Sequence, residues 1–526
     1  MSQRLLALDV GTQSVRAIVF DLAGDIVAQA QVPIEPYVSP QPGWAEQDPE
    51  LYWRSLGEAC AMLWDQPQVE PAQIDALALT TQRVTMCCLD RDGVPLRPAI
   101  VWLDQRQARV DRPLAGPWRA AFKLADLFGL RASETIRSFR GEADSAWVAQ
   151  QQPQIWEQTA MYCGLSGFLS LRLTGDYVDS TGAQVGYIPF DYKAQAWAGP
   201  RSWHWQALPI RPEQLPRLVP PGAPLGALTP EAAAHLGLPA GRPVIAAGAD
   251  KACEVLGAGC VEGDQACLSF GTTATINTTQ RRYREVIPLM PAYPAAMPER
   301  YCTEVQIYRG FWMVRWFTEQ FAQAEQQQAA RQQRHPEELL DELIRDVPAG
   351  SMGLVLQPYW SPGVRDPGLD AKGAVIGFGD VHTRAHLYRA ILEGLAYGLR
   401  AGKERTEARY RTRIKTVRIA GGGSQSDAAM QLTADIFGQA TERPHTHEAS
   451  ALGAAISAAV GLGAYADHTQ AVAAMTRPGQ RFEPIAANVP LYDALYRKVY
   501  QRMYQQLAPL YKDIRAITGY PAPPGE

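Results

Sequence analysis

The sequence predicts a two-lobed α/β protein. Its 526 residues exceed the roughly 250–300 residues at which single hydrophobic cores stop growing, so two large domains are expected. The first sixty residues have the pattern of strand, turn, strand, turn, strand and helix. A second segment of this kind begins near residue 243, after a proline-rich connector at 209–230. We therefore expect lobes over 1–245 and 246–526, with a cleft between them.

Composition and charge narrow the class of ligand. The chain is 46% hydrophobic and 20% charged, which is typical of a globular protein. Its net charge of −4 provides no general attraction for nucleic acid or for an anionic membrane. We expect neither as a partner, and a small ligand would need a local site.

Cysteine usage and apolar runs predict the compartment. Eight cysteines, including the adjacent Cys87 and Cys88, are scattered along the chain and are expected to be reduced core thiols. The N-terminal apolar run is interrupted by Asp9 before it reaches signal-peptide length, and no run of about 18 apolar residues occurs. A soluble, cytoplasmic protein is the expectation.

The elements of the first half follow in order. After the opening strands comes a strand at 26–34 and a helix from about Pro49 to Trp64. Strands are then expected at 74–81, 84–90 and 99–104, before a long helix-rich section that ends near Arg172.

The second half begins with a strand–turn–strand at 266–279, whose Gly-Thr-Thr turn echoes Gly11-Thr12. So short an echo is weak evidence of a shared building block. Residues 322–346 are rich in Gln and Glu and predict a solvated pair of surface helices, with a lid as the alternative. A helix is expected within 417–439, with Ser424 or Ser426 as N-cap and Gly438 after its end.

The opening stretch 5-LLALDVGTQSVRAIVFD-21 places polar groups at a turn. Gly11 lets the backbone turn with its amides exposed, and Thr12 and Gln13 add donors, so the turn could hold a phosphate. Asp9 would then face this anion through a cation such as Mg²⁺, which prefers oxygen ligands. An ordinary hairpin turn, with Asp9 bonding its amides, is the simpler interpretation for this segment alone.

Two further glycine sites suit a nucleotide. The turn at Gly271, Thr272 and Thr273 has the same chemistry, so two turns could grip opposite sides of a triphosphate. The flat surface of 421–423 would let an adenine approach the backbone at a helix start. It is not a Rossmann fingerprint, because Ser426 stands where a glycine would be required.

Asp250 ends an apolar strand and precedes a helix of small residues in 248-GADKACEVLGAG-259. A carboxylate there could accept a proton from a substrate hydroxyl. A helix N-cap is the alternative, and the local pattern favours neither.

An ordered set of motifs resembles the FGGY carbohydrate kinases of the hexokinase–actin superfamily. The set covers nearly the whole chain: LDVGTQSVRAIVFD, PGWAEQDPELYW, TTQRVT, IVWLDQR, GADKACEVLGAG, LSFGTT, 373-GAVIGFGDVHTRAHLYRAILE-393 and AGGGSQSD. The resemblance implies two actin-like (ribonuclease-H-like) α/β lobes around a central cleft for ATP and substrate. Such kinases often form homodimers or tetramers, although no segment of this sequence identifies an interface.

The resemblance also implies roles for individual residues. Asp9 corresponds to the Mg²⁺-side carboxylate and Asp250 to the catalytic base, which also contacts the acceptor. The remaining correspondences comprise the first phosphate turn, the second phosphate turn, the adenosine contacts and the residues that contact or frame the acceptor: Thr12 and Gln13; Gly271, Thr272 and Thr273; Gly422, Gly423 and Gln425; and Trp44, Gln82, Arg83, Trp102 and Asp104. Trp44 and Trp102 have the alternative of being core aromatics.

Three departures leave the substrate open. Arg83-Val84 matches neither the Arg-Glu of glycerol kinases nor the Met-His of xylulose kinases, and Asp144 stands near the place of a usual lysine. Lys251 follows the base, where it could lower the base's pKa, bind an acidic substrate or point to solvent. Because IVWLDQR is closer to the xylulose-kinase type, we expect ATP-dependent phosphorylation of a ketopentose such as D-xylulose. The alternatives are glycerol, another polyol, another ketose or an aldonate, and a non-catalytic nucleotide-binding sugar sensor.

Overall fold

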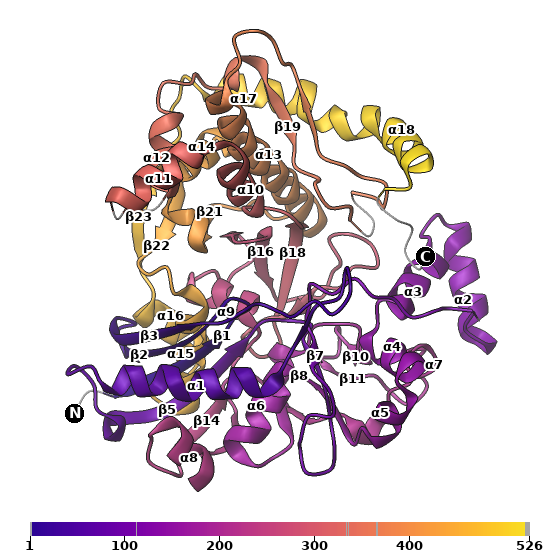
Figure 1. The fold of residues 1–526 in the computed structure, drawn as a ribbon, viewed down its shortest axis with the longest axis vertical. Helices are drawn as coiled ribbons and strands as arrows, with labels where there is room; N and C mark the ends of the chain where they lie inside the picture. Colours follow the sequence, from indigo (N-terminus) through magenta and orange to yellow (C-terminus); the bar gives the residue numbers. More distant parts are fainter. Residues whose placement is uncertain (1–2, 112, 333, 335, 364–366, 521–526) are drawn as a thin grey trace.

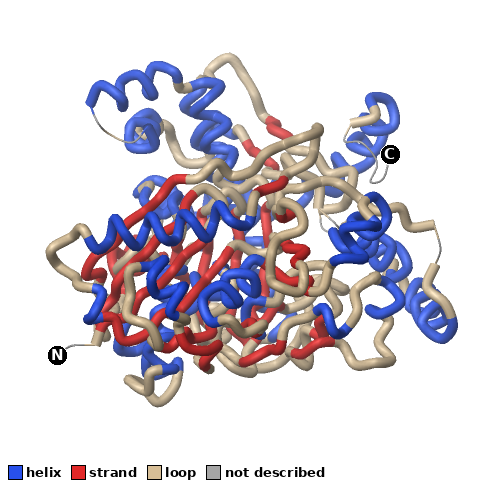
Figure 2. Tube along the Cα trace, turned by 60° about the horizontal axis from the view of Figure 1, so that its bottom comes forward, coloured by secondary structure: helices blue, strands red, loops and turns tan. Residues whose placement is uncertain are grey.

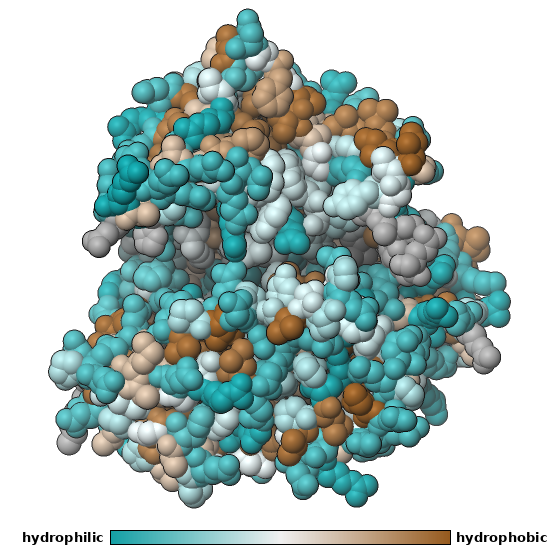
Figure 3. Space-filling model, in the orientation of Figure 1, coloured by the Kyte–Doolittle hydropathy of each residue, from teal (hydrophilic) through white to brown (hydrophobic). Residues whose placement is uncertain are grey.

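The computed structural model describes residues 3–111, 113–332, 334, 336–363 and 367–520. Two large β-sheets form the centres of two lobes, one above the other in Figure 1. Figure 3 shows the surface hollowed between these lobes, with hydrophilic residues prevailing around the hollow. The predicted two-lobed α/β architecture is confirmed.

The N-terminal sheet consists of β1 (Arg4–Val10), β2 (Ser14–Asp21), β3 (Ile26–Pro33), β5 (Ile74–Thr81), β13 (Pro224–Ala227) and β14 (Pro243–Ala246). The C-terminal sheet consists of β15 (Gln265–Phe270), β16 (Ala274–Gln280), β17 (Tyr293–Pro294), β18 (Tyr301–Ile307), β21 (Thr416–Ala420), β22 (Thr441–Pro444) and β23 (Pro478–Phe482). A smaller sheet joins β4 (Glu46–Gln47), β6 (Met86–Leu89), β7 (Ala99–Ile100) and β8 (Met161–Gly164). Short pairs are β9 (Val178–Ser180) with β12 (Arg217–Val219), β10 (Phe190–Asp191) with β11 (Ala196–Trp197), and β19 (Val355–Gln357) with β20 (Ala374–Ile376).

The helices before the second sheet are α1 (Pro49–Trp64), α2 (Gly116–Leu127), α3 (Ala132–Gly141), α4 (Asp144–Gln151), α5 (Pro153–Gln158), α6 (Leu165–Thr174), α7 (His204–Ala207), α8 (Pro230–Leu236) and α9 (Asp250–Gly257). Those after its first strands are α10 (Trp312–Phe321), α11 (Gln323–Gln332), α12 (Pro336–Leu343), α13 (Arg384–Tyr410), α14 (Asp427–Phe437), α15 (Ala449–Gly461), α16 (His468–Met475), α17 (Val489–Leu495) and α18 (Gln501–Thr518). Figure 2 shows the strands grouped in the interior with helices over them.

The two large sheets repeat one topology. In the first, the antiparallel hairpin β1–β2 continues into β3 on one side and into parallel β5 and β14 on the other, with antiparallel β13 at the edge. In the second, the hairpin β15–β16 continues into β18 and, on the other side, into parallel β21 and β22 with antiparallel β23. The echo between the two glycine turns is therefore a true structural repeat.

Strand β1 alternates between two cores. Leu6 and Leu8 pack with α1 and α6, whereas Leu5 and Ala7 pack with α9 and α15. Because successive side chains of a strand point to opposite faces, Asp9 falls on the face covered by α9 and α15. Helix α15 comes from the C-terminal half of the chain yet lies beside β1 and β2 in the lower lobe (Figure 1).

Several local predictions are confirmed. Helix α1 has the predicted bounds, and Asp48 caps it by accepting the amide of Glu50 at 3.0 Å. Ser426 caps α14 and Gly438 ends it in the left-handed region. The Gln- and Glu-rich tract forms the pair α11 and α12. All eight cysteines are free and buried.

Other elements differ from expectation. The strands predicted at 84–90 and 99–104 are shortened to β6 and β7, because Val84 has a φ of +53° and residues 101–104 form a turn closed by the amide of Asp104. Strand β14 still belongs to the first sheet, and α9 follows it directly past the boundary proposed at 245. Within the described residues, no helix is long and apolar enough to cross a membrane.

Helices α9 and α15 cross between the two sheets at a contact made of glycines. A Cβ added to Gly453 would lie 2.0 Å from the carbonyl oxygen of Cys253, and one added to Gly257 would lie 2.0 Å from that of Ala449. Backbone therefore packs directly on backbone, which only glycine permits.

We expect Gly453→Ala to lower the free energy of unfolding by about 1–3 kcal/mol, because the added methyl group overpacks this crossing. Thermal and denaturant unfolding measure the change. Gly199→Ala is the matched control, since a Cβ at Gly199 meets no atom within 4 Å. Unfolding curves that coincide for all three proteins would contradict the close packing.

Candidate active site

The carboxyl ends of β1, β5 and β14 meet at one edge of the N-terminal sheet. Asp9 pairs with Thr80 in the parallel register, and the Thr80 hydroxyl donates to the carbonyl of Gly248 at 3.0 Å. Helix α9 begins two residues later with Asp250. The fold thus brings the two carboxylates singled out in the sequence to the same edge, which is where ligands bind in many α/β proteins.

Asp9 is buried, with 5% of its surface exposed. Burial raises its pKa to about 7; Arg16 opposes this, whereas Glu448 and Asp250 reinforce it. The Arg16 guanidinium lies 3.4 Å from Asp9 and 3.3 Å from Glu448. The alternative in which Asp9 bonds the turn amides is wrong, because its hydrogen-bond donor in the described structure is Arg16.

The residues around Asp9 fit a phosphate and a divalent cation. The amides of Thr12 and Gln13 donate to no acceptor among the described residues, and neither do those of Thr272 and Thr273. The buried Nε of Arg16 also lacks a partner within this part of the chain. An oxyanion would satisfy these donors, and a cation would relieve the repulsion that Glu448 and Asp250 exert on the Asp9 carboxylate. No group of three metal-binding His, Cys, Asp or Glu side chains occurs among the described residues, so such a cation would depend on phosphate oxygens and water.

The first turn is tied to predicted acceptor residues. The Thr12 hydroxyl donates to Gln82 Oε1 at 2.6 Å and accepts from Trp102 Nε1 at 2.9 Å. Gln82 in turn donates to the hydroxyl of Tyr52 at 2.8 Å. This chain of hydrogen bonds places Gln82 and Trp102 directly beside the predicted phosphate turn and engages the hydroxyl of Thr12.

Asp250 is the first residue of α9, and its Oδ1 accepts the amide of Lys251 at 2.7 Å. Ala249 is the N-cap, so the alternative role of Asp250 as a cap is wrong. Its side chain is 31% exposed and can be reached from the cleft. Burial raises the pKa of Asp250, opposed by the charges of Arg83 and Lys251.

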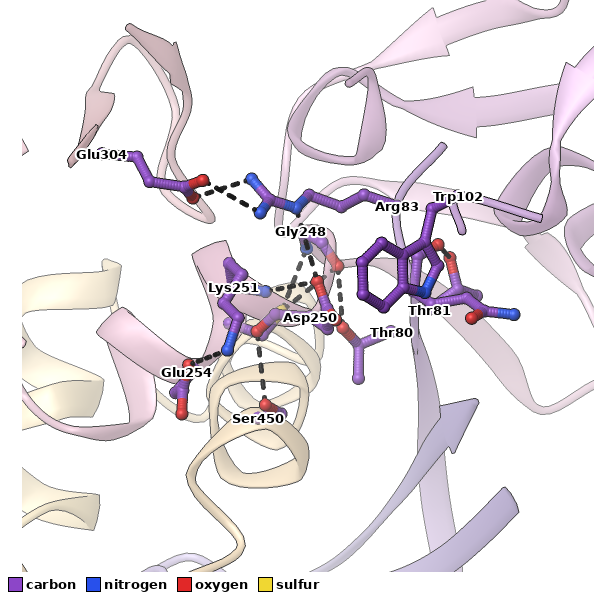
Figure 4. Close-up of polar contacts among 12 residues, drawn as sticks. Thr80, Thr81, Arg83, Trp102, Gly248, Asp250, Lys251, Glu254, Glu304 and Ser450 are labelled. Atoms are coloured by element: carbon purple, nitrogen blue, oxygen red, sulfur yellow. Dashed lines mark hydrogen bonds and ion pairs between the residues drawn. The ribbon is translucent and has the colours of Figure 1, made fainter. Parts of the chain in front are cut away.

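Arg83 connects the lobes across this site. Its two terminal nitrogens lie 2.9 and 3.2 Å from the carboxylate oxygens of Glu304 on β18, and its Nε lies 3.8 Å from Asp250 (Figure 4). Arg83 belongs to the loop after β5 in the lower lobe, whereas Glu304 belongs to the C-terminal sheet. The predicted acceptor residue Arg83 and the predicted base are thus brought together.

Lys251 does not point to solvent. Its ammonium group lies 3.0 Å from Glu254 (Figure 4). It also contacts the hydroxyl of Ser269, which occupies the position in β15 that Asp9 occupies in β1. Burial lowers the pKa of Lys251, but the carboxylates of Glu254 and Asp250 outweigh it and raise the pKa above its usual value. Its charge is therefore paired within the protein.

Phe311 packs against both the second turn, at 271–273, and the glycine surface at 421–423. Phe311 stacks on Phe270 with ring centroids 4.4 Å apart, and its amide donates to Gly271 at 3.0 Å. A Cβ at Gly423 would lie 2.4 Å from the Phe311 ring, whereas one at Gly422 meets nothing within 4 Å. Gly422, Thr272 and Gln425 are exposed beside Phe311. The predicted nucleotide residues of the C-terminal lobe are thus gathered on one surface.

Asp104 lies in a different environment from the one expected. Its oxygens accept the amide of Ala45 and the backbone and guanidinium N–H groups of Arg106. The Arg106 guanidinium lies over the ring of Trp44 at 4.0 Å and over that of Trp147 at 4.5 Å. Asp104 and Trp44 therefore build a cluster beside β4 and β7, in which Asp104 has no free oxygen for an acceptor.

Asp144 begins α4 near this cluster. Burial raises its pKa to about 8, reinforced by Asp104 and opposed by Arg106 and Arg97. The departure noted in the sequence is thus part of the packing around Arg106.

Sequence reasoning missed three charged residues of the site: Arg16, Glu304 and Glu448. Arg16 lies in the opening stretch, where a hairpin that turns at residues 11–14 pairs Asp9 with Arg16 across the two strands. The hairpin predicted from the sequence could therefore have revealed this contact. Glu304 and Glu448 lie in segments without a motif, so only the tertiary structure reveals their positions.

Comparison with known proteins identifies the same family as the sequence motifs. The N-terminal domain of the FGGY family of carbohydrate kinases matches residues 4–257, and its C-terminal domain matches residues 266–462. The uncharacterized sugar kinase YgcE of Escherichia coli K12 is 30% identical over 94% of this chain and 92% of its own. A xylulose kinase of Staphylococcus epidermidis is 27% identical over 98% and 99%. The crystal structure of xylulose kinase from Rhodospirillum rubrum superposes with a TM-score of 0.79 at 27% identity, covering 97% of this chain and all of that one.

The chain therefore belongs to the FGGY family of carbohydrate kinases. The resemblance inferred from the motifs is confirmed, together with the actin-like two-lobed fold and the class of ATP-dependent sugar phosphotransferase.

The hydroxyl of Thr12 provides a test of the turn geometry. Thr12→Val removes the donor to Gln82, which is 4% exposed, and a buried acceptor without a partner costs about 1–3 kcal/mol. We expect this loss in the free energy of unfolding, measured in urea. Thr12→Ser keeps the hydroxyl and should restore most of it; equal stability of the two variants would refute the hydrogen-bond chain.

Proposed function

We propose that the protein transfers the γ-phosphoryl group of ATP to a hydroxyl of a ketopentose, with D-xylulose as the first candidate. One observation carries this proposal. Asp9 and Asp250 lie close enough for their charges to interact, beside two hairpin turns whose amides have no acceptor among the described residues. Phosphoryl transfer needs in-line positioning, neutralised phosphate oxygens and an oriented nucleophile rather than covalent help. This arrangement offers a group for each need.

Asp250 acts as the general base. A hydroxyl of the acceptor would donate to its carboxylate and lose its proton there as the phosphoryl group is transferred. Burial raises the pKa of Asp250, which strengthens it as a proton acceptor, while the charges of Arg83 and Lys251 favour its ionised form. Closure of the lobes excludes water, which would otherwise compete as acceptor.

The nucleotide lies along the two turns. Thr12 and Gln13 contact the phosphates from the lower lobe, and Gly271, Thr272 and Thr273 from the upper lobe; Gly422, Gly423 and Gln425 contact the adenosine. Asp9 holds Mg²⁺, which when bound neutralises charge on the phosphate oxygens. Arg16 orients Asp9 from its other side.

The acceptor contacts Gln82, Arg83 and Trp102, which surround Asp250 and the first turn. Asp104 instead holds Arg106 and supports the neighbouring sheet. A similar protein named xylulose kinase supports D-xylulose as the first candidate. Glycerol, another polyol, another ketose and an aldonate are the other acceptors to be tested.

Location and assembly complete the proposal. Eight buried free thiols support a reducing compartment, the cytoplasm. We also propose a homodimer, as the family resemblance implies.

The decisive experiment is an acceptor panel. Coupled ADP release is measured with ketoses, pentitols, glycerol, erythritol and aldonates, and a large acceptor-dependent rise supports the kinase. If no acceptor raises ADP release although ATP and a sugar both bind, the protein is a non-catalytic nucleotide-binding sensor instead.

Asp250→Asn should lower kcat by at least about 100-fold, since a positioned general base contributes roughly 10²–10⁴-fold. ATP and acceptor affinities, measured by calorimetry, should remain close to those of the unaltered protein. Asp513→Asn, on the exposed face of α18, is the control and should keep full turnover. Full turnover in Asp250→Asn would remove Asp250 from this role.

Gly422→Ala should raise the KM for ATP about 10-fold or more while leaving the melting temperature unchanged. Its methyl group meets no protein atom, so only an approaching adenosine would collide with it. Gly199→Ala is again the control. An unaltered KM for ATP would place the adenosine elsewhere.

A further inference from the structure

Glu304 is a buried carboxylate opposite the base. Its side chain is 7% exposed, and it binds Arg83 through both oxygens, the geometry in which guanidinium and carboxylate pair most strongly. The sequence around it, 301-YCTEVQI-307, contains no motif. The pair spans the two lobes beside Asp250 (Figure 4).

The backbone beside Arg83 is strained to hold this position. Val84 has a φ of +53°, a region that β-branched residues avoid because of steric clash. Such strain persists only where the surroundings enforce it, and it concentrates at functional sites. The ring of Tyr293 lies 5.5 Å from the Arg83 guanidinium and supports it from the upper lobe. Arg83 is thus held from several sides.

Within the described part of the chain, both cations that face Asp250 already have carboxylate partners. Arg83 is paired with Glu304 and lies near Asp250, and Lys251 is paired with Glu254. Among the described residues that form these ion pairs, two cations face three carboxylates, so one negative charge is in excess. A ligand with its own carboxylate would meet repulsion and no unpaired partner, which costs binding free energy.

We propose that Glu304 is a specificity-determining residue, which holds Arg83 across the acceptor site and restricts the acceptor to uncharged polyhydroxy compounds, excluding aldonates. The inference rests on the proposed function and deepens it. Hydroxyl groups of a neutral ketose can accept from Arg83 without displacing Glu304, because a guanidinium has five N–H donors. An aldonate carboxylate would instead find the charge of this guanidinium already neutralised by Glu304 and would be repelled by the carboxylates of Glu304 and Asp250.

The test compares D-xylulose and the other neutral acceptors with D-gluconate in the full-length protein. We expect the unaltered protein to favour its best neutral acceptor over D-gluconate by at least about 100-fold in kcat/KM. Glu304→Gln should lower the KM for D-gluconate about 10-fold or more, since it frees Arg83, and should raise the KM for the neutral acceptor. Glu304→Asp keeps the charge and should preserve the discrimination.

Glu262→Gln is the matched control, because it removes one charge from an exposed pair with Arg281 in the same lobe. The inference is overturned if the unaltered protein uses D-gluconate within 10-fold of its best neutral acceptor. It is also overturned if folded Glu304→Gln retains the selectivity of the Glu262→Gln protein.

A protein without kinase activity can be distinguished from one in which Glu304 has no role in specificity. If no acceptor is phosphorylated, calorimetry with D-xylulose and D-gluconate tests the inference by binding alone. Tighter binding of D-gluconate to Glu304→Gln than to the unaltered protein then supports it, and equal binding overturns it. If Glu304→Gln does not fold, the selectivity of the unaltered protein decides.

Discussion

The crossing of α9 and α15 is the constraint on which the site depends. These helices lie between the two sheets, and at Gly257 and Gly453 their backbones touch without intervening side chains. Helix α9 carries Asp250 at its first residue, and Glu448 immediately precedes α15. Any change in the spacing of these helices would therefore move Asp250, the proposed base, and Glu448, which binds Arg16. Dense packing transmits such shifts, because protein interiors have few voids in which to absorb them.

Two networks of charged side chains lie next to this crossing, one around Asp9 and one around Asp250. Around Asp9, the Arg16 guanidinium is shared with Glu448, which also lies 3.3 Å from His447, and the charges of Glu448 and Asp250 both raise the pKa of Asp9. A bound cation would relieve this repulsion. Around Asp250, Arg83 and Lys251 are each paired with another carboxylate, Glu304 and Glu254, and their charges lower the pKa of Asp250, the proposed base. The repeated sheets explain the arrangement. Asp9 and Ser269 occupy matching positions on matching strands, and each faces the helices between the lobes.

Local chemistry made much of the fold predictable. The apolar pattern predicts helix α1 at its observed bounds, and the structure adds Asp48 as its N-cap; Ser426, one of two predicted caps, and Gly438 mark the ends of α14. The strands near Val84 and Asp104 were overestimated, because the apolar pattern continues through residues that tertiary contacts hold in turns. Asp104 was assigned to the acceptor by its motif, yet Arg106 engages its carboxylate in the structure. A motif specifies residue types, whereas side-chain partners depend on neighbours distant in the chain.

The sequence by itself determined the fold class, the family, the repeated glycine turns and the two carboxylates that the chemistry requires. These features depend on local periodicity, turn residues and motif order, all of which are written along the chain. Only the tertiary structure decided which charges meet. Arg83 finds Glu304 from 221 residues away, and Arg16 finds Glu448 from 432 residues away. Ion pairs between segments this distant in the chain leave no pattern in the sequence, since their geometry arises only when the helices and sheets pack.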